Sequence, residues 1–195
     1  MVYHSIAEIF DALDATRARL TSSVEGLGEG QERFRPAPER WSIAEIIEHL
    51  SLAEASSLRL FDKLLQKAEE AGRTRDASDP FAPVSIAEQA QSRRGEKFQT
   101  PDRIRPTGEV PLADSLRSLR DTLAAIHALR PRVERAVCAD VHFPHPAFGP
   151  LNLYQWLIFT ALHEERHLAQ IEALKEEMKG KRGCRVSGAG CRLKT

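Results

Sequence analysis

Four long segments of the chain repeat apolar residues with the period of an α-helix, and this feature limits the fold more than any other. Almost no segment alternates apolar and polar residues as a half-buried strand would. Four amphipathic helices must bury their apolar stripes against one another. A chain of 195 residues is long enough for one such domain with a real core. The sequence therefore predicts an all-α four-helix bundle.

The first two predicted helices have clear ends. The first runs from about Ser5 to Val24, and a glycine-rich stretch follows it. The second opens with a capping box formed by Ser42 and Glu45, and Gly72 suits the position after its last turn. The stripe that it is expected to bury consists of Ile43, Ile46, Ile47, Leu50, Ala53, Ser57, Phe61 and Leu64.

The last two predicted helices are separated by an irregular stretch, residues 140–150. The third helix starts near Leu112, and Pro131 is expected to end or kink it. The fourth opens at Asn152, with Gln155 as its capping partner, and continues to about residue 179.

A long crossover, residues 73–111, joins the second and third helices. It is polar, contains several prolines, and has room for one short helix near residues 85–94. We expect the bundle to occupy residues 1–179. Residues 180–195 form a basic, glycine-rich tail that we expect to be disordered.

The composition excludes several classes of function. Lys and Arg number 28, as do Asp and Glu, so no net charge attracts nucleic acid or an anionic membrane. No apolar run reaches the roughly 18 residues of a membrane span, and we find no signal peptide. Cys138, Cys184 and Cys191 form no disulfide framework, which favours a reducing cytoplasm.

The most informative short motif is HEERH, residues 163–167, in the fourth predicted helix. His163 and His167 lie about 40° apart on the helical wheel, in the middle of the apolar face, and Gln170 joins them there. Two inward imidazoles one turn apart are hard to satisfy with hydrogen bonds, but they can bind one metal ion together. Two interpretations stay open at this point: hydrogen-bonded core histidines, or a pair of metal ligands.

The motif also fits the H-E-x-x-H pattern of zinc proteases, but its context does not. The offsets where one protease group needs Gly and His hold Gln170 and Ala173. Other such proteases take a third ligand further downstream, and no acidic residue or histidine follows Glu177. A di-iron carboxylate bundle is excluded as well, because it needs two E-x-x-H pairs and only one is present.

A third ligand must come from another helix, and His49 is the best candidate. It lies inside the second predicted helix, at the edge of the apolar stripe. The alternative for His49 is a half-solvated boundary residue. The remaining histidines are weaker candidates: His4, His127, His142 and His145.

Two glutamates lie next to these histidines along the chain. Glu164 follows His163, and it is the candidate catalytic residue, as a general base or a group that orients a ligand ring; the alternative is a solvated surface side chain. Glu45 lies one turn before His49 and could hydrogen-bond a ligand, with the same alternative.

Three stretches of the chain resemble the DinB-like superfamily. WSIAEIIEHL at 41–50 resembles the opening of its second helix, with its W-S-x-x-E-x-x-x-H-L pattern. KFQTPDRIRPTGEVPLADSLRSLRDT at 97–122 resembles its proline-punctuated crossover. HPAFGPLNLYQWLIFTALHEERHLAQI at 145–171 resembles its H-P-x-x-G-x-L loop and H-x-x-x-H-x-x-Q-I helix. The resemblance spans roughly residues 1–178 in the same order.

The resemblance implies an up-down-down-up bundle that is often dimeric. It also implies a divalent metal bound by His49, His163 and His167. Three neutral imidazoles with one open position are typical of a catalytic metal. Zn or Ni is the expected ion, followed by Fe or Mn. Members of the family include transferases and isomerases that use low-molecular-weight thiols.

Two hypotheses for function follow. The first is a metal-dependent enzyme that acts on a small molecule, either a thiol-dependent S-transferase or isomerase, or a hydrolase. The second is a non-catalytic, stress-associated helical dimer with a structural metal or none. In both we expect a homodimer with no nucleic-acid or membrane partner, because the basic tail is short and has no interleaved aromatic residues.

Overall fold

The computed structural model describes residues 1–72, 74–76, 79–87 and 100–186. Four long helices form the body of the molecule: α1 (Ile6–Val24), α3 (Ile43–Glu70), α5 (Leu112–Arg135) and α6 (Leu153–Val186). They are joined by short elements: α2 (Glu29–Glu32), the 3₁₀ turn η1 (Asp102–Ile104) and the strands β1 (His142–His145) and β2 (Gly149–Asn152). Helix α6 continues seven residues beyond the predicted end at residue 179.

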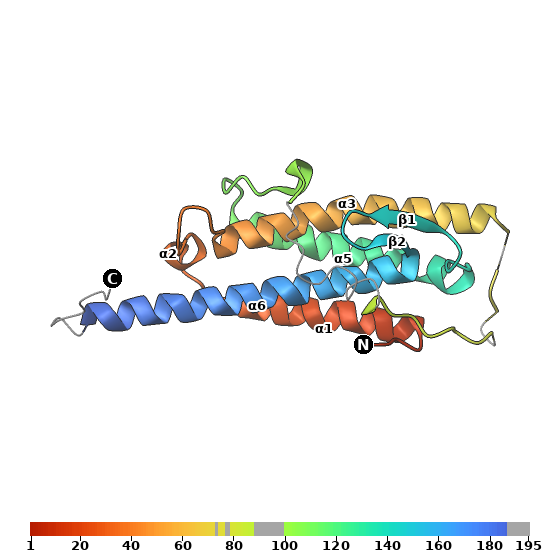
Figure 1. Cartoon of the computed structure of the whole chain (residues 1–195), viewed down its shortest axis with the longest axis horizontal. Coiled ribbons are helices and arrows are strands. Elements are labelled where there is room, and N and C mark those ends of the chain that lie inside the picture. Colours follow the sequence, from red (N-terminus) through yellow and green to blue (C-terminus); the bar gives the residue numbers. More distant parts are fainter. Residues whose placement is uncertain (73, 77–78, 88–99, 187–195) are drawn as a thin grey trace.

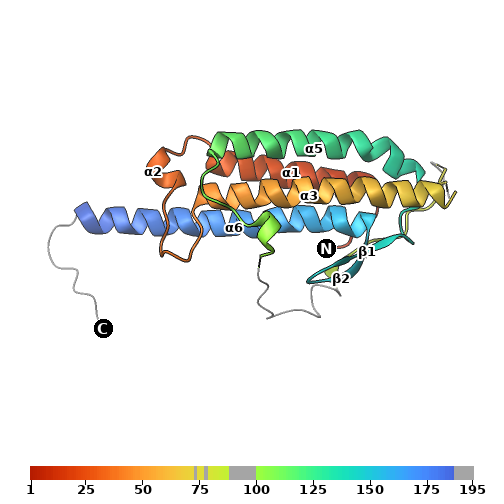
Figure 2. The same cartoon turned by 90° about the horizontal axis from the view of Figure 1, so that it is seen from above.

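The helices run up, down, down and up, as predicted. Figures 1 and 2 show α1 and α6 running in one direction, with α3 and α5 parallel to each other in the opposite direction. Helix α1 packs on α6, and α3 packs on both α5 and α6. The parallel α3–α5 pair requires the chain to return the length of the bundle, which explains the long crossover. The four-helix bundle is therefore confirmed.

The predicted caps form where the sequence places them. The Ser42 hydroxyl accepts a hydrogen bond from the Glu45 amide at 3.3 Å, and the Glu45 carboxylate accepts one from the Ser42 amide at 2.9 Å. The amide groups of Asn152 and Gln155 make the same reciprocal pair at 3.0 Å each at the start of α6. Gly72 follows α3 with φ of 69°. These local bonds fix the two helices that carry the candidate site.

Residues 140–150, expected to be irregular, contain a short antiparallel hairpin. His142 pairs with Asn152, and His145 pairs with Gly149. Pro144 and Pro150 face each other in this ladder, and prolines at these positions argue against strands in a sequence. Both strands are edge strands, so a missing amide donor is tolerated. The Trp156 indole donates to the Phe143 carbonyl at 3.3 Å and ties the hairpin to α6.

Pro131 does not end α5, which runs on to Arg135. A proline removes one helical hydrogen bond, and here the loss falls in the last turns of the helix. In the crossover, Val84 pairs with Tyr3 and Thr74 pairs with Ala136. The predicted short helix at residues 85–94 lies largely outside the described residues, as does the tail beyond residue 186.

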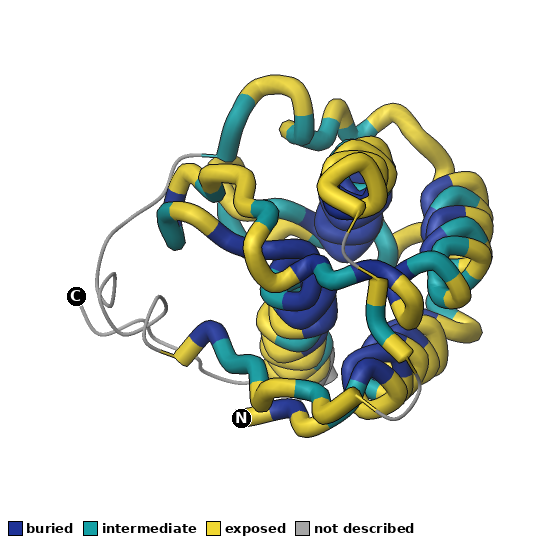
Figure 3. The backbone as a smooth tube through the Cα atoms, turned by 90° about the vertical axis from the view of Figure 1, so that its right-hand side faces the viewer, coloured by how far each residue is buried: buried dark blue, intermediate teal, exposed yellow. Residues whose placement is uncertain are grey.

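The interior contains two apolar clusters, one toward each end of the bundle. Phe10, Leu13, Phe61 and Leu157 belong to the first. Leu20, Leu50, Leu168 and Ile171 belong to the second. Figure 3 shows that the buried residues of the helices face inward. Along α1, α3 and α6, buried polar side chains lie between the residues of the first cluster and those of the second. The candidate site belongs to this polar layer. No helix among the described residues has the length and apolarity needed to cross a membrane.

Candidate metal centre

Three histidine side chains meet between α3 and α6, and we call His49, His163 and His167 the histidine cluster. The Nε2 atom of His163 lies 3.3 Å from Nε2 of His49 and 3.2 Å from Nε2 of His167. One ring nitrogen from each residue lies within 4.8 Å of the others. His49 and His167 are 4% and 5% exposed, and His163 is half-buried. The structure therefore brings together the three residues that the sequence selects.

Hydrogen bonds on the far side of two rings fix where their protons lie. His49 Nδ1 is 2.7 Å from the carbonyl oxygen of Ile104. A carbonyl can only accept, so Nδ1 carries the proton and Nε2 keeps its lone pair. His167 Nδ1 is 3.0 Å from the Gln170 amide oxygen, and it donates there in the same way. Both rings thus turn an unprotonated Nε2 toward His163.

This arrangement is not satisfied by hydrogen bonds alone. A neutral His163 ring protonated at Nε2 can donate to one of its two neighbours, which leaves the other lone pair without a donor. A cation at the meeting point would satisfy all three nitrogen atoms. Three imidazole ligands suit Zn²⁺ or Ni²⁺ and leave a coordination position open. The donor set of the described residues therefore fits a divalent ion.

Burial keeps these imidazoles uncharged. It lowers the pKa of His49, lowers that of His163 well below its usual range, and lowers that of His167 to about 4. The neighbouring rings and the Arg166 guanidinium lower the pKa of His163 further. At neutral pH the rings are uncharged, which is the charge state that binds metal.

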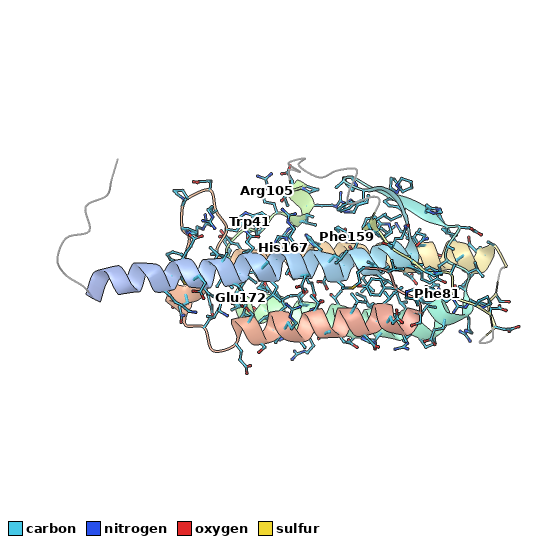
Figure 4. The ribbon with its side chains drawn as sticks, turned by 60° about the horizontal axis from the view of Figure 1, so that its bottom comes forward. Trp41, Phe81, Arg105, Phe159, His167 and Glu172 are labelled. Carbon is cyan, nitrogen blue, oxygen red and sulfur yellow. The ribbon has the colours of Figure 1, made fainter. Side chains whose placement is uncertain are left out.

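Aromatic side chains form the wall of the cluster. The Trp41 ring centre lies 4.9 Å from that of His49 and 6.5 Å from that of His167. Phe159 stacks on His163 at 5.4 Å, and His145 of the hairpin packs on Phe159 at 4.4 Å. Figure 4 shows Trp41, His167 and Phe159 along the same part of α6. The wall excludes water from one side of the cluster and strengthens electrostatic interactions inside it.

The loop that supplies the Ile104 carbonyl is held by Glu48, which the sequence analysis missed. Glu48 is 2% exposed, and its carboxylate accepts from the Thr107 amide and hydroxyl at 2.8 Å each and from the Gly108 amide at 2.9 Å. Because His49 follows Glu48 directly, one turn of α3 fixes both the loop and the ring that bonds to it. In the sequence, the signal for this role is that the carboxylate of Glu48 directly precedes an inward-facing histidine.

Glu45 does not contact a histidine among the described interactions. Its carboxylate caps α3 and pairs with Arg35. The other histidines stay outside the cluster. His127 bonds to Asp14 at 2.7 Å, and His142 is exposed on the hairpin.

Glu164 does not lie in the histidine cluster, which corrects the expectation of a general base beside the metal. It is also not a solvated surface residue, because it is 1% exposed. The Arg17 Nε–H donates to its carboxylate at 2.6 Å. One residue along a helix is a rotation of about 100°, which takes Glu164 from the face of His163 to the face that packs on α1.

Glu164 belongs to a second buried group, which we call the Arg17 cluster: Arg17, Glu54, Glu164 and the carbonyl of Leu119. The Arg17 guanidinium pairs with both carboxylates and donates to that carbonyl. Burial and the nearby Glu164 raise the pKa of Glu54 well above its usual range, which shifts it toward its neutral form. This cluster ties α1, α3, α5 and α6 together at the level of the histidines.

The sequence pattern of the DinB superfamily matches residues 12–171, which include all three histidines. The chain belongs to the DinB superfamily. The Bacillus subtilis (strain 168) protein YuaE, itself uncharacterized, is 27% identical over 168 residues, which cover 83% of this chain and 94% of YuaE.

Two solved structures share the fold of this DinB-superfamily chain. TT2238, a four-helix bundle protein, has a TM-score of 0.55 at 21% identity and covers 86% of this chain and 98% of its own. YfiT from Bacillus subtilis has a TM-score of 0.56 at 20% identity and covers 89% and 87%. YfiT is described as a probable metal-dependent hydrolase with an unusual four-helix bundle topology. At these identities the likeness establishes the fold.

Proposed function

We propose that the chain is a metal-dependent hydrolase whose His49, His163 and His167 hold one divalent ion, Zn²⁺ or Ni²⁺. The observation that carries the proposal is the meeting of three Nε2 atoms at 3.2 and 3.3 Å. Two of these atoms are unprotonated because of the bonds to Ile104 and Gln170. Hydrogen bonding within the cluster satisfies only one of them, whereas a cation satisfies both.

The residues around the histidine cluster have separate roles. Ile104 and Gln170 orient two of the ligand rings and fix their tautomers, as outer partners of metal-binding histidines do. Trp41 and Phe159 exclude water from one side. When bound, a divalent ion with an open position supplies Lewis acidity to a substrate oxygen and lowers the pKa of a coordinated water.

Hydrolysis is favoured over other reactions by the likeness to YfiT, which is described as a probable metal-dependent hydrolase. A thiol-dependent transfer or isomerisation is the second candidate, because the resemblance of motifs in the sequence implies it. Both reactions use the same three histidines and a small-molecule substrate. The homodimer stays a prediction.

A test starts with protein purified without a histidine tag and stripped of metal with a chelator. It is reloaded with Zn²⁺ or Ni²⁺ and assayed on ester and amide substrates, with and without an added thiol. We expect turnover only after reloading, and a loss of at least about 100-fold in H163Q. H127Q is the matched control, because His127 bonds to Asp14 outside the cluster.

The outcomes separate the hypotheses. Turnover that needs both metal and thiol would favour the transferase. Bound metal without turnover on any substrate would favour the non-catalytic protein. Equal turnover by the stripped protein and by H163Q would contradict a metal-dependent enzyme.

A further inference from the structure

Of the three residues of the histidine cluster, His49 and His167 are buried and His163 is half-buried. On α6, Arg166 follows His163 by one turn, about 60° round the helix, and on the side opposite Glu164. Arg166 is exposed. A ligand that reached His163 from this face of α6 would therefore lie beside Arg166.

Arg166 has no hydrogen-bond or ion-pair partner among the described residues, whereas the nearby carboxylates are all engaged. Glu165, its neighbour on α6, pairs with Arg19 at 2.8 Å. Glu48 is occupied by the Thr107 loop, and Glu164 by Arg17. No carboxylate described near the cluster is thus left to neutralise Arg166.

The turn η1 adds positive charge at the same side. The Ile104 carbonyl bonds to His49, and the two residues that flank Ile104 are Arg103 and Arg105, both exposed. Asp102 pairs with Arg105 at 3.2 Å, so Arg103 has no ion-pair partner among the residues that the structure describes. Figure 4 shows Arg105, directly after η1, on the same side of the molecule as Trp41 and His167.

The charge of the site selects the class of ligand. Three neutral imidazoles leave the charge of a bound divalent ion intact, and Arg166 adds another positive charge beside it. A planar guanidinium binds a carboxylate or phosphate through two parallel hydrogen bonds. Attraction by the same charges would also raise the local concentration of anions.

We infer that the substrate carries an oxyanion, a carboxylate or a phosphate group, and that Arg166 binds this group while the substrate lies at the open position of the histidine cluster. The inference rests on the proposed metal site and deepens it by naming the substrate class. Arg166 would determine specificity, and the ion would still bind to the three histidines without it.

The test compares wild-type protein, R166Q and R117Q, each loaded with Zn²⁺ and checked for metal content. R117Q is the matched control, since Arg117 pairs with Asp114 on the exposed face of α5. Calorimetry measures the affinity for benzoate and for its neutral analogue benzamide. We expect R166Q to hold the metal, to bind benzoate about tenfold more weakly, and to bind benzamide as the wild type does. R117Q should bind both probes normally.

Loaded wild-type protein that binds no benzoate, or an R166Q variant with unchanged benzoate affinity, would overturn this inference and leave the metal site standing. An equal loss of benzoate and benzamide binding in R166Q would also overturn it, because the effect would then not depend on charge. Wild-type protein that binds no metal would overturn the proposed function together with this inference.

Discussion

The Arg17 cluster and the histidine cluster are two buried polar groups that share helices α3 and α6, yet their polar atoms are paired in different ways. His49 and Glu54 lie five residues apart on α3, and His163 and Glu164 are adjacent on α6. The Arg17 cluster contains its own counter-charge, because one guanidinium pairs with two carboxylates. The histidine cluster contains only neutral rings, two of which present lone pairs to the third.

This difference separates a structural group from a binding site. Buried polar atoms must be paired, and each missing partner costs free energy. Within the bundle, Arg17 neutralises the charge of the carboxyl groups it pairs with, although Glu54 Oε1 and Glu164 Oε2 each lack a hydrogen-bond partner among the described residues. The histidine cluster needs a partner from outside, and a divalent ion fits it. The comparison predicts that damage to the Arg17 cluster lowers stability, whereas damage to the histidine cluster removes binding.

The largest effect is expected for R17M in metal-free protein. The substitution leaves the Glu164 carboxylate without its cation and the Glu54 carboxyl group without its donor, and we expect the free energy of unfolding to fall by about 3–5 kcal/mol. Chemical denaturation at pH 7 measures it. E54Q should cost less than about 1 kcal/mol, because Glu54 already tends to its neutral form. R19Q breaks only a surface ion pair and serves as the control. If R17M lowered the free energy of unfolding as little as R19Q does, the structural role of the Arg17 cluster would be contradicted.

A smaller effect is expected for E48A, which reaches the histidine cluster through its loop. The substitution leaves the amides of Thr107 and Gly108 without their acceptor, at a cost of about 2 kcal/mol. Without Glu48, the loop no longer holds the Ile104 carbonyl against His49. The affinity for Zn²⁺ should therefore fall about tenfold. E109A, in the same loop but exposed, serves as the control for both measurements. Unchanged Zn²⁺ affinity in a destabilised E48A would show that the loop does not position His49.

The smallest effect concerns His145, beside the aromatic wall of the cluster. Burial lowers its folded-state pKa to about 4, below the ordinary value near 6.5, so folding opposes its protonation. Its contribution to stability is therefore intact above pH 6.5 and is lost as the pH falls toward 4. H145F has no imidazole to titrate. The free energy of unfolding of H145F minus that of the wild type should therefore be about 1 kcal/mol larger at pH 5 than at pH 8, after allowance for the partial exposure of His145. Denaturation curves at the two pH values test this, and equal differences at both would contradict it.

Local patterns made much of this molecule predictable. Helix α1 begins after Ser5, α3 after Ser42 and α6 after Asn152, because each cap depends on residues three positions apart. His163 and His167 were predictable for the same reason, since one turn of helix brings them together. His49 needed the motif resemblance as well, because its place at the edge of a stripe left its burial open.

Contacts between distant residues could not be predicted in the same way. Arg17 interrupts the apolar stripe of α1 between Leu13 and Leu20, which signals a buried charge but names no partner. Its partners Glu54 and Glu164 lie 37 and 147 residues away. Glu48 was missed because the loop it holds, at Thr107 and Gly108, lies within the crossover, which has no periodic pattern. The hairpin was missed because its two facing prolines are typical of irregular chain.

The most direct test of the account is metal binding and unfolding temperature measured together, on untagged wild-type protein and on H49A and H163A. We expect one divalent ion per wild-type chain and a stabilisation of about 2.7 kcal/mol when free Zn²⁺ is at 100 times its Kd, with neither effect in the variants. Without metal, the variants should stay folded. Wild-type protein that binds no ion, or H163A that binds Zn²⁺ and is stabilised as the wild type is, would contradict the account.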